Sequence, residues 1–240
     1  MWQPFWQTSR KGWAMAFKRA LQPAEVPEPD VLTAAMVGIG MNFAASGTAD
    51  ANIEDTLLFA SVEAMDRDDL RVLAVLVTWF GVHAGWVNAD RLIKLVSAYP
   101  SLRVRALWAG LARWQAKDRR FLRLTRLHRG ARVDLLRVGT EFQIKRHGED
   151  ERFIGGPLCV PANVLRDRAH DVLSPSQLAR RHRAYRWRVI IGPSYRADVW
   201  AALERNPDLS PTLLARKTYG SFATAWQVRR DFAIARGRGD

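Results

Sequence analysis

Hydrophobic positions follow the 3.6-residue period of an α-helix through much of the chain. Residues 70–82 are apolar almost all round, which predicts a helix in the centre of a core, with Asp66 or Asp68 as its cap. The complete pattern predicts helices over residues 53–65, 70–82, 89–98, 102–117, 174–188, 195–205, 211–218 and 222–235. Small polar residues suited to N-caps precede five of them, at Asn88, Ser101, Ser174, Ser210 and Ser221.

Two of these helix pairs have a common order of residues. Residues 88–108 and 209–228 each contain an N-cap, an apolar pair, a tyrosine, a turn-forming residue and a serine that caps a second helix. This order is typical of a helix-turn-helix, so both segments are predicted to form one.

Between the two pairs the hydrophobic period shortens towards two. Residues 121–138 alternate apolar and basic side chains around a His-Arg-Gly turn, which predicts a β-hairpin. A second small hairpin is expected within residues 139–164. The expected fold is therefore mainly α with small β-hairpins, an α+β protein built from tandem winged helix-turn-helix-like units. Its segments are an aromatic and basic arm with a Pro-rich linker (1–30), a first winged-helix-like domain (31–138), a β-hairpin connector (139–164) and a second helix-turn-helix domain (165–240).

Positive charge is concentrated in two blocks of the sequence. The net charge is +13; residues 101–137 hold 11 basic and 2 acidic residues, and residues 165–240 hold 15 basic and 7 acidic residues. A solubilising surface usually mixes both signs, whereas Arg-rich blocks are typical of surfaces that neutralise phosphates. Double-stranded DNA is therefore the expected partner.

Candidate DNA contacts follow from the expected helix-turn-helix geometry. The second helix of each pair enters the major groove, where glutamine suits adenine and arginine suits guanine. Small residues at Ala106 and Gly110 permit close approach either to a groove or to another protein helix. The run from Arg180 to Arg188 is too basic to be buried. The full candidate set is Ser101, Arg103, Arg105, Arg113, Arg119, Arg120, Arg123, Arg126, Arg129, Arg132, Arg180, Arg181, Arg216, Lys217, Ser221, Thr224, Gln227 and Arg230.

The stretch LSPTLLARKTYGSFATAWQVRRDF, residues 209–232, resembles the helix-turn-helix of bacterial winged-helix regulators. It also resembles the DNA-binding domains of abortive-infection-type antitoxins, which bind their own promoters. The likeness covers residues 195–235, with a weaker echo at 68–137. It implies a sequence-specific DNA-binding protein, either a bacterial transcriptional regulator or repressor or an autoregulating antitoxin in phage defence.

Other functions are open alternatives. The aromatic and basic residues 1–21 suit an adaptor that grips a toxin or another protein, and a homodimer is compatible with the sequence. Asp134, Glu141 and Lys145 faintly resemble a metal-dependent nuclease motif, but Gln143 stands where an acidic ligand is expected. We therefore expect no enzyme activity, no metal and no cofactor.

The remaining features of the composition predict a cytoplasmic protein. Cys159 is the single cysteine, which excludes an internal disulfide and a cysteine-based zinc site. No segment has the ~18 consecutive apolar residues of a spanning helix, so no membrane association is expected.

Overall fold

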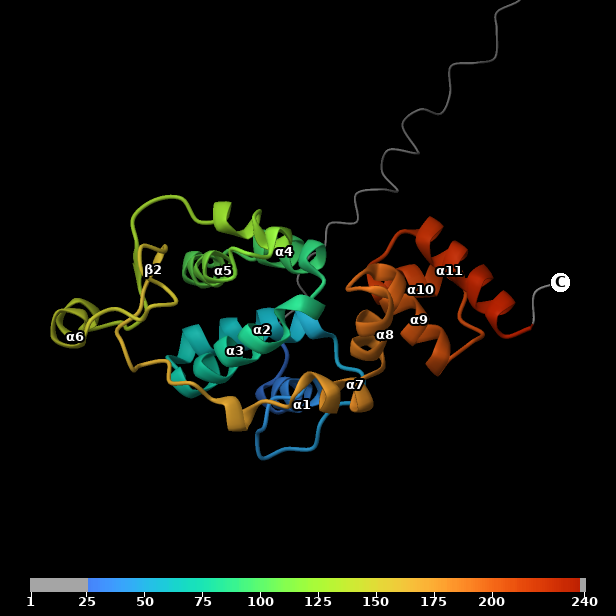
Figure 1. The fold of residues 1–240 in the computed structure, drawn as a ribbon, viewed down its shortest axis with the longest axis horizontal. Helices are drawn as coiled ribbons and strands as arrows, with labels where there is room; N and C mark the ends of the chain where they lie inside the picture. The colour runs from blue at the N-terminus through green and yellow to red at the C-terminus, as the bar shows by residue number, and fades with distance from the viewer. Residues whose placement is uncertain (1–25, 238–240) are drawn as a thin grey trace, which may run out of the picture.

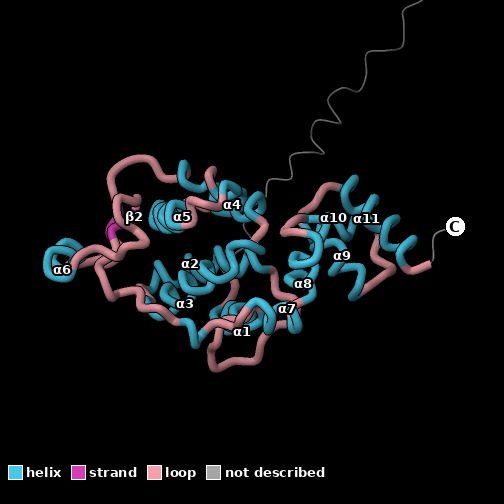
Figure 2. The backbone as a smooth tube through the Cα atoms, viewed as in Figure 1, coloured by secondary structure: helices cyan, strands magenta, loops and turns pink. Residues whose placement is uncertain are grey.

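Two hydrophobic cores organise residues 26–237, the part of the chain that the computed structural model describes (Figure 1). Helices dominate, with two short strands, as Figure 2 shows. The predicted arm, residues 1–21, lies outside the described residues. The helices of the N-terminal core and its surroundings are α1 (Pro29–Gly38), α2 (Ile53–Arg67), α3 (Leu70–His83), α4 (Ala89–Ala98), α5 (Leu102–Trp114) and α6 (Thr140–His147). The helices that follow are α7 (Pro175–Arg181), α8 (Arg183–Ile191), α9 (Tyr195–Arg205), α10 (Pro211–Thr218) and α11 (Phe222–Ala235).

Helix α3 lies in the centre of the N-terminal core, as its apolar sequence predicted. Trp79 and Phe80 are fully buried, and Phe80 meets Trp108 of α5 edge to face, with ring centroids 5.4 Å apart. A buried indole needs an acceptor for its N–H. Trp79 donates to the carbonyl of Ile39 at 2.8 Å, and Trp108 donates to the Ser61 hydroxyl of α2 at 3.0 Å. These bonds fix α2, α5 and the end of α1 around α3.

Local capping signals predicted the helix starts well. The expected bounds of α4, α9, α10 and α11 are confirmed, and the five predicted N-cap side chains each accept a backbone N–H from the first turn. The cap of α3 is Asp69, whose carboxylate accepts from two backbone N–H groups at 3.0 Å. Asp68 instead ends α2 in a left-handed conformation, so neither expected cap is correct.

The first expected hairpin is wrong. Residues 121–138 contain the end of one 3-10 turn (Arg119–Phe121), a second turn (Leu124–Arg126) and the strand β1 (Val133–Asp134). Phe121 and Leu124 are both buried. Their three-residue spacing places them on the same side of 3-10 turns, whereas a strand would require a spacing of two. The predicted wing of the first unit is therefore absent.

The second expected hairpin is also wrong. Residues 142–145 belong to α6, where Glu141 and Lys145 form an i,i+4 ion pair at 2.7 Å. Strand β2 (Leu158–Cys159) pairs with β1 in parallel, with Val133 opposite Leu158. A parallel pair cannot be a hairpin, because its strands need a long connection, which α6 and its flanking loops supply.

The helix expected over residues 174–188 is divided into α7 and α8 at His182. This residue has an extended conformation, and its Nδ1 accepts the backbone N–H of Tyr185 at 3.1 Å. Its Nε2 donates to the carbonyl of Ala51 at 2.8 Å. The break is therefore a buried cap that joins the α7–α8 corner to the residues before α2.

The C-terminal core belongs to α9, α10 and α11. Its buried residues are Val199, Leu203, Leu214, Ala215, Ala225, Val228 and Phe232. None of the helices in the described part of the chain combines the length and apolarity that crossing a membrane demands.

Candidate nucleic-acid interface

The turn between α10 and α11 has the residues that a tight helix-turn-helix requires. Tyr219 adopts a left-handed conformation with φ of 58° and ends α10. A Cβ on Gly220 would lie 3.3 Å from the Thr218 hydroxyl and 3.5 Å from the Tyr195 side chain, so the turn favours a residue without one. Ser221 then caps α11 by accepting the N–H of Thr224 at 3.0 Å.

Helix α11 has one buried side and one uncovered side. Ala225, Val228 and Phe232 pack on α9 and α10, whereas Gln227 and Arg230 are exposed. Figure 1 shows α11 on the side of α9 away from the N-terminal core. The predicted α11 contacts are therefore available to a partner, except for the half-buried Thr224, whose hydroxyl bonds with that of Ser221 at 2.9 Å.

Cations at the end of α10 add positive charge near this helix. Arg216 and Lys217 are exposed, and no acidic side chain of the described residues lies within 4.0 Å of either. Arg230 stacks on the exposed ring of Trp226, with 5.7 Å between the guanidinium carbon and the ring centroid. The outer side of the α10–α11 pair is therefore basic and aromatic.

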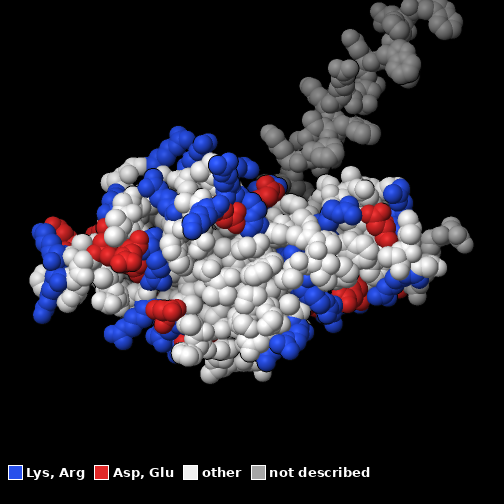
Figure 3. All heavy atoms as spheres, in the orientation of Figure 1, with Lys and Arg blue, Asp and Glu red and all other residues white. Residues whose placement is uncertain are grey.

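A second basic surface lies beside α4 and α5. We call residues 117–129 the basic segment; Lys117, Arg119, Arg126 and Arg129 of this segment are exposed and have no ion pair with the described residues. Arg123 is 68% exposed and lies 3.7 Å from Asp90 of α4. Figure 3 shows Lys and Arg side chains gathered over the α4–α5 region. Of the basic residues expected on a wing, Arg119, Arg120 and Arg126 lie on 3-10 turns instead, and Arg123, Arg129 and Arg132 lie in the connecting segments.

Asp90 connects the basic segment to the start of α9. Its carboxylate accepts the Tyr195 hydroxyl of α9 at 3.0 Å and pairs with Lys94 at 2.6 Å, besides its contact with Arg123. Burial acts to raise the pKa of Asp90, but the bonds from Lys94 and Tyr195 outweigh it and hold that pKa below its ordinary value. The charged form is therefore favoured at neutral pH, and the link persists there.

Helix α5 does not present the free face that a groove-binding helix needs. Residues 106–112 are all buried, and a Cβ on Gly110 would lie 2.9 Å from the Phe153 ring. Both Ala106 and Gly110 are therefore turned into the protein and not towards a groove, although the neighbour of Gly110 is Phe153 in a turn and not the helix expected as the alternative. The first expected unit therefore lacks both an accessible second helix and a wing.

Five predicted arginines near α5 are engaged within the fold. Arg103 donates to the carbonyls of Met65 and Leu135, each at 2.7 Å, and to the Asp68 carboxylate. The other four, with their acceptors, are Arg105 (Ser97 carbonyl), Arg113 (Gly155 carbonyl), Arg120 (Ala84, Gly85 and Val87 carbonyls and Asp118) and Arg132 (Gly156 carbonyl and Glu149).

The remaining predicted positions are Ser101 and two arginines of α7. Ser101 is used as the N-cap of α5, accepting from Val104 at 3.4 Å. Arg180 is exposed and donates to the Ser176 carbonyl of its own helix at 3.2 Å. Arg181 is exposed and has no ion pair with the described residues.

Sequence reasoning missed a buried ionic cluster where the two cores meet. Arg188 of α8 is only 2% exposed, which contradicts the expectation that its basic run cannot be buried. Its guanidinium donates to Glu54 of α2 at 2.6 and 2.9 Å and to Asp198 of α9 at 2.9 and 3.1 Å. One guanidinium thus holds two carboxylates in bidentate geometry, which lets a charge be buried because its donors are used.

Burial affects the two carboxylates of this cluster differently. It acts to raise both pKa values, but at Glu54 the charge and hydrogen bonds of Arg188 outweigh it and the pKa is lowered. At Asp198 burial prevails and the pKa is raised. The only signal of this cluster in the sequence is an acidic residue in the first turn of α2 and of α9. Acidic residues are also favourable there because they interact with the helix dipole, so they do not by themselves indicate a buried ion pair.

The nuclease motif does not form the strand face that it would need. Glu141, Gln143 and Lys145 lie on α6. Among the described residues, no three His, Cys, Asp or Glu side chains gather into a group suited to a metal ion. Comparison with protein-family models, with curated proteins and with solved structures finds no match to this chain.

Proposed function

We propose that this protein binds double-stranded DNA, with α11 in the major groove and the basic segment on the phosphate backbone. The observation that carries the proposal is the α10–α11 pair. Its second helix is buried on one side and exposes Gln227 and Arg230 on the other. A helix with a free polar face at the end of a tight turn matches how such pairs read base edges.

The basic segment supports the proposal through its charge and its position. Its exposed cations Lys117, Arg119, Arg126 and Arg129 lack acidic partners among the described residues, so they are available to phosphates. Asp90 contacts both Arg123 of this segment and Tyr195 at the start of α9. Tyr195 also lies beside Gly220 in the α10–α11 turn. The basic segment is therefore connected to the start of α11 through α4 and α9, and in the proposed complex one duplex contacts both.

The biological role that follows is sequence-specific regulation. The α10–α11 sequence resembles bacterial winged-helix regulators and antitoxins that repress their own promoters, and a protein with one reading helix and a phosphate-binding surface suits either role. The structure lacks the wing that many regulators use, and in this proposal the basic segment takes its place.

Fluorescence anisotropy with duplex DNA tests the proposal. Duplexes selected from a random library and an unselected duplex should both bind, with log affinity falling by roughly 0.9 per neutralised phosphate for each unit of log salt. Arg126→Gln should weaken binding to both duplexes and flatten that slope by about one unit. Gln227→Ala should cost about 1–3 kcal/mol on the selected duplex alone. Lys145→Gln on α6 is the control and should match the parent protein.

Two results would contradict DNA binding. One is affinity that does not respond to salt; the other is parental behaviour from both Arg126→Gln and Gln227→Ala. If the full chain ignores duplex DNA at low salt and binds one stoichiometric protein instead, it is an adaptor.

A further inference from the structure

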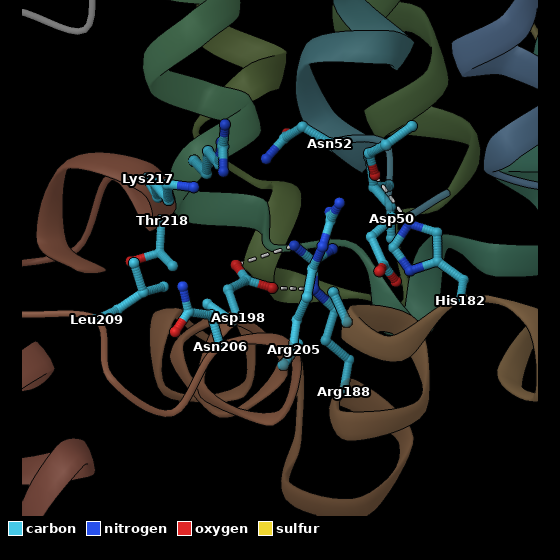
Figure 4. Close-up of a pocket in the computed structure, with 16 residues that line it drawn as sticks. Asp50, Asn52, His182, Arg188, Asp198, Arg205, Asn206, Leu209, Lys217 and Thr218 are labelled. Carbon is cyan, nitrogen blue, oxygen red and sulfur yellow. Dashed lines mark hydrogen bonds and ion pairs between the residues drawn. The ribbon is translucent and has the colours of Figure 1, made fainter. Parts of the chain in front are cut away.

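A cavity of about 460 Å³ lies where the helix-turn-helix meets the N-terminal core. Its walls come from both sides: residues 50–53 before and at the start of α2, and Arg205, Asn206, Lys217 and Thr218 from the α9–α10 region (Figure 4). This volume falls within the roughly 300–1,000 Å³ of small-molecule sites. The cavity therefore has room for a ligand that touches both parts of the protein.

The acidic groups in the wall are already neutralised. Asp50 accepts the backbone N–H of Arg183 at 3.0 Å and pairs with its guanidinium, and Asp198 is held by Arg188. His182 uses both ring nitrogens on backbone groups, and burial lowers its pKa, so it is neutral at neutral pH. No carboxylate in the wall is left to attract a cation.

The donors in the wall are, by contrast, unused. Arg205 and Lys217 are exposed and have no ion pair with the described residues. Asn52 and Asn206 use their Oδ1 atoms to accept backbone N–H groups, each at 3.1 Å, and no described acceptor bonds to their Nδ2 groups. Figure 4 shows Asn52 and Lys217 extending towards each other from opposite walls. Two cations and two amide donors thus converge on one space.

The deeper wall has the same character. Arg91 is fully buried against this cavity and stacks on Tyr219, with 4.0 Å from its guanidinium carbon to the ring centroid. Its Nε and Nη1 have no hydrogen-bond acceptor among the described residues. Buried donors without acceptors are rare in folded proteins and need an explanation. The Nη2 of Arg91 already pairs with Asp55 at 2.8 Å, so an anion in the cavity would supply an acceptor for the two nitrogens that lack one.

We propose that this cavity binds the phosphate group of a small organic phosphate. A phosphate monoester carries about −1.5 to −2 charges and three terminal oxygens, which match two unpaired cations and two amide donors. A carboxylate has one charge and two oxygens, and leaves part of this donor set unused. The cavity also has apolar wall residues, Ile53, Ala201 and Leu209, against which the carbon skeleton of the ligand packs.

Occupancy of the cavity is coupled to DNA binding, and this step rests on the proposed function. The ligand would contact residues of both cores, since the cavity is lined by both. It also engages Lys217, one of the cations expected on the DNA backbone. Ligand and DNA therefore oppose each other, and linkage requires each to weaken the other by the same factor.

Binding is tested without DNA by following the side-chain amide signals of Asn52 and Asn206 in the NMR spectrum of the full chain. Inorganic phosphate and ribose 5-phosphate should shift both signals saturably, and ribose should not. Lys217→Gln and Arg205→Gln should each weaken binding about tenfold, as expected for losing one charge-assisted hydrogen bond. Both side chains are exposed, so each variant is expected to fold, and each tests the site independently of the other. Arg126→Gln should bind phosphate like the parent.

Three outcomes would overturn the site. They are no saturable shift through the millimolar range, equal binding in the parent and both cavity variants, and loss of binding in Arg126→Gln, which would place phosphate on the DNA surface. Anisotropy with and without ribose 5-phosphate then separates the two proposals. Phosphate binding without any DNA binding refutes the proposed function alone, and DNA binding without amide shifts refutes the cavity site alone.

Discussion

Replacing Arg188 with methionine should destabilise the protein by about 3–5 kcal/mol, the usual cost of removing one partner from a buried ion pair. Methionine fills most of the vacated volume, so packing contributes little to this loss. The cost arises because Glu54 and Asp198, which are 0% and 8% exposed, lose four hydrogen bonds of 2.6–3.1 Å. The cation left near Glu54 is Arg91, whose Nε lies 4.0 Å away.

The matched control is Arg186→Met on the same helix. Arg186 pairs with Glu204 at 2.6 Å, but the two side chains are 40% and 28% exposed. Such pairs contribute about 0–1 kcal/mol, because water solvates the partner that remains. Both variants replace an arginine of α8 with methionine, so the difference between their free energies of unfolding reports the effect of burial.

Urea denaturation followed by tryptophan fluorescence measures both variants at pH 7.5 and at pH 5. In Arg188→Met, like charge and burial raise the pKa of the Glu54–Asp198 pair, so a proton stabilises the variant as the pH falls. The gap between parent and variant should therefore narrow at pH 5. A loss below about 1 kcal/mol, equal to that of Arg186→Met, would refute the assignment of Arg188 as a buried anchor.

Two further predictions concern the N-terminal core. Burial lowers the pKa of His83 to about 4 from 6.5, against the opposing effect of its hydrogen bond to the Leu173 carbonyl. As the pH falls, the unfolded chain therefore takes up the proton before the folded one does. The free energy of unfolding falls by up to roughly 3 kcal/mol between pH 6.5 and pH 4. His83→Gln should flatten this pH dependence in urea titrations, and an unchanged slope would contradict the prediction. Gly110→Ala should cost about 1–3 kcal/mol through overpacking against Phe153, whereas Gly85→Ala, with nothing within 4 Å of its Cβ, should not; equal melting temperatures would contradict this.

The sequence predicted most of the helices, α1 and α6 excepted, because their signals are local. Ser210, Pro211 and Ser221 specify the starts of α10 and α11 within three residues, and both helices have the expected bounds. The prediction of a hairpin over residues 121–138 failed because the spacing of its apolar residues is ambiguous. A few apolar residues separated by arginines fit both the two-residue period of a strand and the three-residue period of a 3-10 turn. Phe121 and Leu124 are both buried, which agrees with the three-residue period.

Only part of the candidate site was predictable from the sequence. The rest depends on contacts between residues that lie far apart in the chain. The exposed face of α11 follows from helical periodicity alone. The use of Arg103 and Arg188 does not, since the Leu135 carbonyl lies 32 residues from Arg103 in the chain and Glu54 lies 134 residues from Arg188. An arginine in a basic run has the same sequence signature whether it faces solvent or holds two buried carboxylates.

The anchor at Arg188 also determines what the proposed DNA surface can do. Apolar contacts tolerate sliding, but a guanidinium bidentate to two carboxylates fixes direction as well as distance. Glu54 lies on α2 in the N-terminal core and Asp198 lies on α9, so this side chain, together with the Asp90–Tyr195 contact, holds the two cores in one orientation. In the proposed function a duplex contacts α11 on one core and the basic segment on the other. The base contacts of α11 and the phosphate contacts of the basic segment therefore depend on this orientation, and a ligand in the cavity, which Arg188 and Asp198 line, would bind at the same junction.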